Sequence, residues 1–187
     1  MTARLDVLVT GYAAERVAGT VTLLRDGASV VVVDPGMVAD RAQILDPLRA
    51  LGVEPGAVTD VVLSHHHPDH TVNIALFPAA RVHDSMATYE GDLWTDHEPG
   101  PFVLTESIQL LPTPGHTEVD LSTLVATADG LVVLTHLWWS ADGPAEDPFA
   151  PDRDQLRSSR RAVLDRHPVL VVPGHGAPFV PTADTPL

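Results

Sequence analysis

The stretch VTDVVLSHHHPDH, residues Val58 to His70, decides the fold. Its first half, 58–63, is dominated by valine and leucine and predicts a strand buried on both faces. Directly after this strand the chain places four histidines and one aspartate in the six positions 65–70. The end of a buried strand is where α/β proteins commonly hold functional sites, and imidazole with carboxylate suits zinc, iron or manganese. The stretch therefore predicts a transition-metal site at a strand end.

Two more histidines have a similar setting, in a glycine turn after a predicted strand. His116 lies in TPGHT, residues 113–117, and His175 lies in PGHG, residues 173–176. A neighbouring glycine lets the backbone come close and turns the ring inward. One such turn would be unremarkable, and a His-rich surface loop is the alternative, but three strand ends with histidine favour a metal site. The isolated histidines are expected to have no metal role: His83, His97 and His167.

The composition describes a globular chain with an acidic surface. A length of 187 residues with 44% hydrophobic residues suits one domain over residues 1–187 with a sizeable core. The formal charge of −14 repels phosphate backbones, so nucleic acid is an unlikely partner and a small-molecule substrate is expected. Because the chain has no cysteine, all metal ligands must be nitrogen or oxygen, and no cysteine nucleophile exists.

The apolar runs of the chain are too short to span a bilayer, and no membrane partner is expected. The N-terminal residues carry no apolar run of signal-peptide length. We therefore expect a cytoplasmic protein. The acidic surface leaves room for a homodimer, formed through the first strands or through the pair Trp138 and Trp139.

β-branched and alternating stretches predict a chain built mainly of strands. The expected strands are 5–10, 17–24, 28–33, 58–63, 81–83, 102–104, 108–111, 121–126, 131–134 and 169–172. Helices are expected over 39–51, kinked or split at Pro47, and over 152–166. Two segments rich in glycine, proline and acid, 89–101 and 140–151, are expected to be surface loops. Strands mixed with few helices predict a layered α/β sandwich.

The motif His-x-His-x-Asp-His at 65–70 resembles the signature of the metallo-β-lactamase superfamily. The turns around His116 and His175 and the Asp-Pro-Gly turn at 34–36 are similar to that family too, so the resemblance covers essentially the whole chain. The segment 69–78 is similar to one narrower branch of the family. The resemblance implies an α/β fold, the four-layer αββα metallo-β-lactamase sandwich, with the site at one edge of its two sheets.

The resemblance also implies roles for individual residues. It assigns His65, His67 and His116 to a first metal, and Asp69, His70 and His175 to a second. Asp69 would also be catalytic, because it would orient the nucleophile and carry its proton. His66 has no counterpart among the ligands and is expected to face away from its neighbours, as strand-like alternation predicts.

His136 is where the chain departs from the family. The family usually has an aspartate after the strand that follows the third histidine, bridging two metals, and here His136 follows 131–135. A carboxylate has two oxygens, whereas neutral imidazole has one free lone pair. One metal held with His136, two metals joined only by hydroxide, and a His136 in an outer or outward position all stay open. Asp142 is too distant along the chain to replace the bridge. Trp138 and Trp139 either wall the site or pack under the following loop.

The leading hypothesis is a metallo-hydrolase with one or two transition-metal ions, zinc first, then iron or manganese. A bound metal lowers the pKa of a coordinated water from about 15.7 to about 7. The expected substrate is a small ester, thioester, lactone or phosphoester, because the acidic charge disfavours the RNA processing implied for the narrower branch. A mononuclear iron dioxygenase of a thiol or persulfide is one alternative, which an all-histidine first site would oppose. A catalytically impaired metal-binding protein, in which His136 marks a lost activity, is the other.

Overall fold

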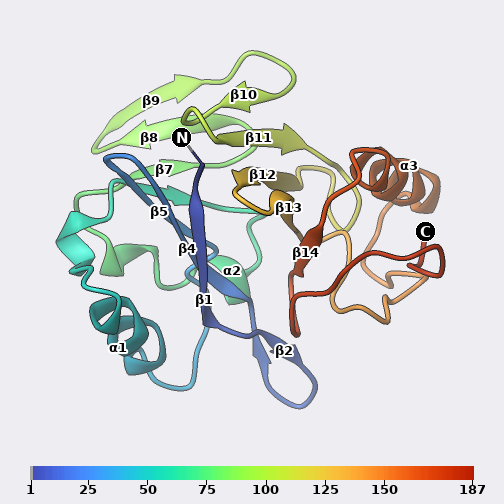
Figure 1. The fold of residues 1–187 in the computed structure, drawn as a ribbon, viewed down its shortest axis with the longest axis horizontal. Helices are drawn as coiled ribbons and strands as arrows, with labels where there is room; N and C mark the ends of the chain where they lie inside the picture. The colour runs from blue at the N-terminus through green and yellow to red at the C-terminus, as the bar shows by residue number, and fades with distance from the viewer. Residues whose placement is uncertain (1) are drawn as a thin grey trace.

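The computed structural model describes residues 2–187, and most of its strands form two sheets (Figure 1). The seven-stranded sheet has the order β1 (Arg4–Val9), β4 (Val21–Asp26), β5 (Ser29–Val33), β6 (Asp60–Val62), β7 (Arg81–His83), β8 (Ala87–Glu90) and β9 (Leu93–Asp96). The five-stranded sheet has the order β10 (Phe102–Val103), β11 (Ile108–Pro112), β12 (Leu121–Thr127), β13 (Gly130–Thr135) and β14 (Leu170–Pro173). A separate hairpin is formed by β2 (Tyr12–Ala13) and β3 (Val17–Ala18). The helices are α1 (Ala42–Ala50), α2 (Pro68–Thr71) and α3 (Arg153–Leu164), with short 3-10 turns at Pro55–Ala57 and Ile74–Leu76.

Three buried clusters define four layers. In β5, Val31 and Val33 face a core shared with the second sheet, whereas Val32 faces the core under α1. In β13, Leu134 faces the shared core, and Val133 faces the core under α3. This alternation follows from the two-residue period of a strand, and it requires valine or leucine on both faces. The layers are therefore α, β, β and α, as the resemblance implied.

Helix α1 accommodates a proline without being split. It begins at Ala42, three residues later than the sequence predicts, and Pro47 lies inside it. Proline has no N–H to donate within a helix, but the burial of Ile44 and Leu48 under the first sheet holds the helix in place. The helix ends before Gly52, whose φ of +77° suits glycine.

The prediction of a surface loop at 89–101 is wrong for its first half. This part belongs to the β8–β9 hairpin, in which Glu90 pairs with Leu93 across a turn of Gly91 and Asp92. All four residues of β9 are exposed, so the strand lacks the buried alternation that would have marked it. The Gly-Asp dipeptide is a known hairpin signal and was the available clue.

The predicted strand 17–24 is also wrong as one element, because it is interrupted between β3 and β4. Gly19 lies at the interruption, and its N–H donates to the backbone carbonyl of Asp69 at 3.0 Å. A Cβ on Gly19 would approach that same oxygen to 2.6 Å, so only glycine fits. Within residues 2–187 no helix combines the length and the apolarity that crossing a membrane requires.

Candidate metal centre

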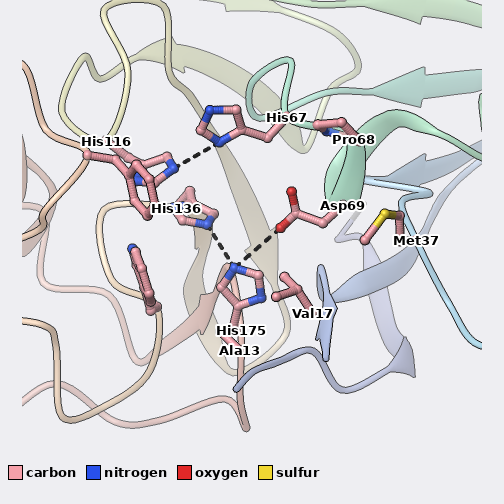
Figure 2. Close-up of a pocket in the computed structure, with 11 residues that line it drawn as sticks. Ala13, Val17, Met37, His67, Pro68, Asp69, His116, His136 and His175 are labelled. Carbon is pink, nitrogen blue, oxygen red and sulfur yellow. Dashed lines mark hydrogen bonds and ion pairs between the residues drawn. The ribbon is translucent and has the colours of Figure 1, made fainter. Parts of the chain in front are cut away.

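The seven side chains predicted as ligands all come together at one edge of the two sheets. Figure 2 shows those that line the pocket above this edge, namely His67, Asp69, His116, His136 and His175. On the side of the first sheet, His65 follows β6, and the next three ligands lie in and around α2: His67, Asp69 and His70. On the side of the second sheet, His116 precedes β12, His136 follows β13 and His175 follows β14. Every one of these residues stands at or just beyond the end of a strand or in a short helix. The strand ends hold the donors in place.

The ring nitrogens of the histidines face one another at short range. His67 Nδ1 lies 3.0 Å from His65 Nε2 and 3.1 Å from His116 Nε2. His136 Nε2 lies 3.2 Å from His175 Nε2. Imidazole nitrogens that converge in this way present several lone pairs to one small volume, as a transition metal requires.

The potential ligand atoms fall into two groups, and His136 belongs to both. The groups are His65 with His116 and His136, and His70 with His136 and His175, each with its ligand atoms within 4.8 Å of one another. The His136 ring is only 2% exposed and points into the cluster. The outward-facing alternative for His136 is therefore wrong.

Four of the histidines have an outer hydrogen-bond partner on the nitrogen that faces away from the cluster. These partners are Ser64 Oγ for His65 (2.9 Å), Asp34 Oδ2 for His70 (2.9 Å), Asp147 Oδ2 for His116 (2.8 Å) and the Ala18 carbonyl for His175 (2.9 Å). Metal-ligating imidazoles characteristically bond a carboxylate or carbonyl in this way, which fixes the tautomer and the ring orientation. The cluster thus has a second set of residues that aim its donors.

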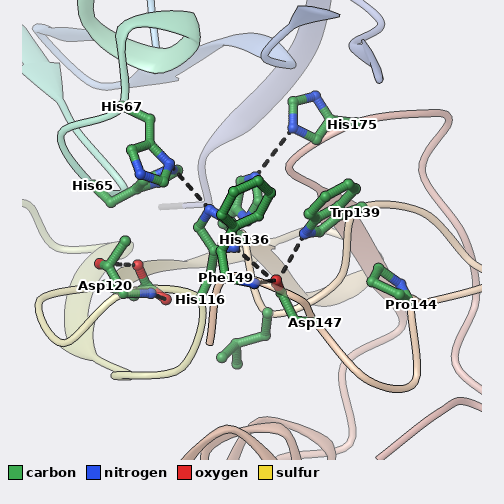
Figure 3. A network of polar contacts seen from close by, with 12 residues as sticks. His65, His67, His116, Asp120, His136, Trp139, Pro144, Asp147, Phe149 and His175 are labelled. Atoms are coloured by element: carbon green, nitrogen blue, oxygen red, sulfur yellow. Dashed lines mark hydrogen bonds and ion pairs between the residues drawn. The ribbon is translucent and has the colours of Figure 1, made fainter. Parts of the chain in front are cut away.

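Asp147 is the residue of this site that the sequence did not reveal (Figure 3). It lies in the predicted loop 140–151, which contains neither helix nor strand, yet it is 1% exposed. Its carboxylate accepts hydrogen bonds from His116 Nδ1, from Trp139 Nε1 at 2.9 Å and from the Phe149 N–H at 2.9 Å. Burial would raise the pKa of Asp147, but these hydrogen bonds hold it below its usual value. Nothing in the sequence separates it from the other acids of the loop.

The protonation states of most histidines in the cluster favour metal binding. Burial, followed by neighbouring positive charge, lowers the pKa of His65 and His136, and burial is also the main cause that lowers the pKa of His67 and His175. These rings are neutral near pH 7 and keep a free lone pair. Burial opposes the charge on His70 as well, but Asp34 and Asp69 raise its pKa to about 9. Burial would raise the pKa of Asp69, but His70 lowers it to about 2. A metal at His70 would therefore displace a proton.

The packing around the cluster fits a metal as well. His70 Nε2 and His136 Nδ1 are buried without a hydrogen-bond partner among residues 2–187, although His70 Nε2 lies 3.3 Å from an oxygen of Asp69. Buried polar atoms are normally satisfied, so these two indicate a missing partner. Gly36 packs on the Asp69 backbone and Gly174 on the His136 ring, each too closely to allow a Cβ. The residues present therefore fit a transition metal held by nitrogen and oxygen.

A pocket of about 400 Å³ opens above the cluster. Its walls are apolar and include Val17, Met37, Trp139 and Phe149, and the last two rings stack at 5.9 Å between centroids. Trp138 is fully buried and packs in the core under α3 instead. Of the two tryptophans, Trp139 therefore walls the site and Trp138 is a packing residue.

The remaining histidines stay outside the cluster, as predicted. His66 faces away and contacts Asp84 at 2.9 Å. His83 and His97 both bond the hydroxyl of Thr88, and His167 is exposed. Asp142 is exposed too and does not enter the cluster, so it does not replace a bridging carboxylate.

Comparison with known proteins identifies relatives that match this chain in sequence. The family model described as the metallo-beta-lactamase superfamily matches residues 14–105. Metallo-beta-lactamase domain-containing protein 1 of Xenopus laevis is 34% identical over 94% of this chain and 80% of its own length. The human protein of that name is 38% identical over 80% of this chain but only 59% of its own length. This is the branch indicated by segment 69–78.

Solved structures share the architecture at lower identity. A metallo-beta-lactamase-family protein from Thermotoga maritima superposes with a TM-score of 0.74 at 21% identity, over 97% of this chain and all of that one. A quorum-quenching N-acyl homoserine lactone hydrolase superposes with a TM-score of 0.69 at 20% identity, over 93% of this chain and 91% of that one. The layers, the strand-end histidines and the identity to the frog protein together establish that this chain belongs to the metallo-β-lactamase superfamily.

Proposed function

We propose that this chain is a metal-dependent hydrolase of a small acyl substrate, an ester, thioester or lactone. The observation that carries the proposal is the convergence of six imidazoles and the Asp69 carboxylate beneath an apolar pocket, which four of these imidazoles and Asp69 line. Metallo-hydrolases of this superfamily, including the lactone hydrolase, support the reaction class.

The pocket walls favour an acyl group over a phosphoester. None of the chain's arginines lines the pocket of about 400 Å³ within the described residues, whereas Val17, Met37, Trp139 and Phe149 do. A phosphoryl group would bring negative charge that these walls cannot pair, while an acyl chain would bury apolar surface against them. Of the four expected substrate types, the phosphoester is therefore the least suited.

The residues of the site have two roles: some would bind the metal, and others would assist the reaction. The residues that would hold metal are His65, His67, His116, His136, Asp69, His70 and His175. A bound transition metal would polarise the substrate carbonyl and activate a water near neutral pH. Asp69 stays ionised, so it can accept the proton of the attacking water and orient it. Trp139 and Phe149 would exclude bulk water and align the acyl group.

The test combines metal analysis with turnover. Protein purified without added metal would be analysed for bound elements and assayed on a panel of esters, thioesters and lactones. We expect zinc, iron or manganese, and hydrolysis that a chelator abolishes and the metal restores. His116→Ala should lose both metal and turnover, and the exposed His167→Ala should keep both.

Two outcomes would favour the alternatives. Iron together with oxygen uptake on a persulfide would indicate a dioxygenase. Bound metal without turnover on the whole panel, with hydrolysis gained in His136→Asp, would indicate an impaired enzyme. Either result would overturn the hydrolase proposal.

A further inference from the structure

A second hollow adjoins the metal pocket. It is a groove of about 780 Å³ between the β2–β3 hairpin and the segment that leads into α1. Val17 and Met37 line both the groove and the metal pocket, so they form the shared rim. A ligand with its carbonyl at the histidines can therefore extend into the groove.

Two arginines distinguish this groove from the rest of an acidic surface. Arg16 and Arg41 line it, and Glu15 is the one acid that does so among residues 2–187. Five other arginines are ion-paired: Arg25, Arg49, Arg81, Arg153 and Arg157. Arg16 and Arg41 form no ion pair within residues 2–187. In a chain with a formal charge of −14, the groove thus carries more positive than negative charge.

Arg41 is held in place by its surroundings. Its Nε donates to Asn73 Oδ1 at 2.9 Å, and the Asn73 amide donates to the carbonyl of Gly36 at 2.7 Å. Asn73 is 5% exposed, and Gly36 packs on the Asp69 backbone, so this anchor belongs to the framework of the histidine cluster. Both Nη nitrogens of Arg41 stay without a partner in the described part of the chain. A guanidinium presented in this way binds carboxylate or phosphate well.

The remaining lining of the groove is largely apolar. Tyr12, Val17, Met37 and Val72 are all large apolar side chains with substantial exposure. Apolar surface beside a cationic group suits a ligand that has an apolar body and an anionic end. A simple anion would leave most of this surface unused.

We propose that the groove is a substrate subsite that binds an anionic group, carboxylate or phosphate, on an acyl substrate whose carbonyl lies at the histidine cluster. This inference rests on the hydrolase function proposed above and names its substrate class. The anion would lie against Arg16 and Arg41, outside the apolar pocket that holds the acyl chain.

Three matched thioesters of hexanoic acid test the proposal. Their thiols are 1-propanethiol, 3-mercaptopropionate and 2-mercaptoethyl phosphate, so they differ in carrying no anion, a carboxylate or a phosphate. Hydrolysis adds water to the carbonyl carbon, breaks the C–S bond, and yields hexanoate, the free thiol and one proton. Because the chain has no cysteine, a thiol reagent measures only the product. We expect kcat/KM for one or both anionic thioesters to exceed that for the neutral one about tenfold, as hydrogen bonds to charged groups allow.

Variants of the groove should change this preference in opposite directions. Arg16→Ala with Arg41→Ala should bring the ratio of kcat/KM values close to one, and Glu15→Gln should raise it. Arg166→Ala removes an exposed arginine beyond α3 and should leave the ratio unchanged. An equal kcat/KM for the three thioesters in the wild type would overturn the subsite while leaving the hydrolase standing. A preference that survives the double variant would overturn it too.

A binding measurement separates the two proposals. The thioether 3-(hexylthio)propanoate cannot be hydrolysed, and its Kd can be measured by calorimetry on the purified protein. If no thioester is hydrolysed, the hydrolase proposal fails for thioesters, and the Kd still tests whether the groove binds the carboxylate. A Kd about tenfold weaker in the double variant supports the subsite. The same Kd in both proteins would mean that the carboxylate binds elsewhere and would overturn it.

Discussion

The ring of His136 lies among histidines of both groups, with its centroid 4.6 Å from that of His65 and 4.8 Å from that of His70. Neutral imidazole offers one lone pair, so a metal that takes it in one group removes it from the other. An aspartate in this place could serve both groups through its two oxygens. We therefore expect the chemistry of this one side chain to limit how many metals the site can hold.

His136→Asp should raise the tightly bound metal from about one to about two ions per chain, since a carboxylate can bridge where imidazole cannot. Elemental analysis after dialysis against metal-free buffer measures this number. His167→Asp makes the same substitution on the surface and should match the wild type. Two tightly bound ions in the wild type would show that the two groups do not compete for His136.

Asp147→Asn should weaken metal binding about 10- to 100-fold, because His116 would lose the ionised acceptor that orients its ring. Competition with a fluorescent chelator gives the affinity. Trp139 loses the same acceptor, so its fluorescence should change in the same variant. Asp142→Asn removes an exposed acid from the same loop and should do neither. An unchanged metal affinity in Asp147→Asn would show that this carboxylate does not support metal binding and only holds the loop in place.

At the scale of residues, the sequence locates the donors better than their supports. The histidines can be found because each follows a strand in a recognisable turn, as at His116 and His175. Asp147 could not be found, because its role depends on a contact across 31 positions with His116. His136 could be noticed as a departure, but only its burial and its contact with His175 in the folded chain reveal that the ring points inward.

Among the elements, β6 and β7 are joined by a buried charge cluster as well as by their backbone. The Asp60 carboxylate contacts Arg81 at 2.7 Å and His83 at 2.8 Å, and it accepts a hydrogen bond from the Thr59 hydroxyl at 2.7 Å. Burial would raise the pKa of Asp60, but His83, Thr59 and Arg81 lower it below its ordinary value of 3.8. The ionised carboxylate thus stabilises the strand that precedes the metal motif.

Asp60→Asn should lower the free energy of unfolding at pH 7 by about 2 kcal/mol, because the variant leaves the buried His83 and the half-exposed Arg81 without the carboxylate charge. The folded pKa lies below the unfolded one, so the wild-type advantage exists above the unfolded pKa and is lost as the pH falls through the folded pKa. The difference between the two proteins should therefore shrink below pH 3.8. Urea unfolding at pH 7 and in this acid range measures it. Asp184→Asn, at an exposed position, should lower stability at neither pH.

Elements with a buried face are predictable, and exposed or interrupted ones are not. The hydrophobic pattern identifies β5 and β13 because both faces of these strands are covered. The same pattern misses β9, because all its side chains are exposed. It also predicts β3 and β4 as one strand, because the interruption at Gly19 depends on a hydrogen bond to the distant Asp69. Long-range contacts decide these boundaries, and local propensity does not contain them.

For the whole molecule, the histidine cluster connects the two sheets. His65 and His70 follow β6 of the first sheet, and His116 and His175 belong to the loops of the second. A metal that binds donors from both sides binds only the folded arrangement. Its binding energy is therefore added to the free energy of unfolding.

Removal of the metal should lower the melting temperature of the whole chain. At a free metal concentration 100 times the Kd, the bound ion adds about 2.7 kcal/mol, or about 5–10 °C for a chain of this size. Calorimetry with and without chelator measures the shift. It should persist in His167→Ala and shrink in His116→Ala, which lacks a donor from the second side. Equal melting temperatures with and without metal would mean that the cluster contributes nothing to the cohesion of the sheets.

The spread of the donors along the chain also matters during synthesis. The donors within 65–70 are translated together, and by themselves they make only an incomplete, open set of ligands. His136 follows β13 and His175 follows β14, the last strand of the second sheet, and the carbonyl that orients His175 belongs to Ala18, 157 positions earlier. The enclosed geometry that discriminates between ions therefore exists only in the finished fold. We therefore expect any selection between metal ions to be made by the folded molecule and not by the nascent motif.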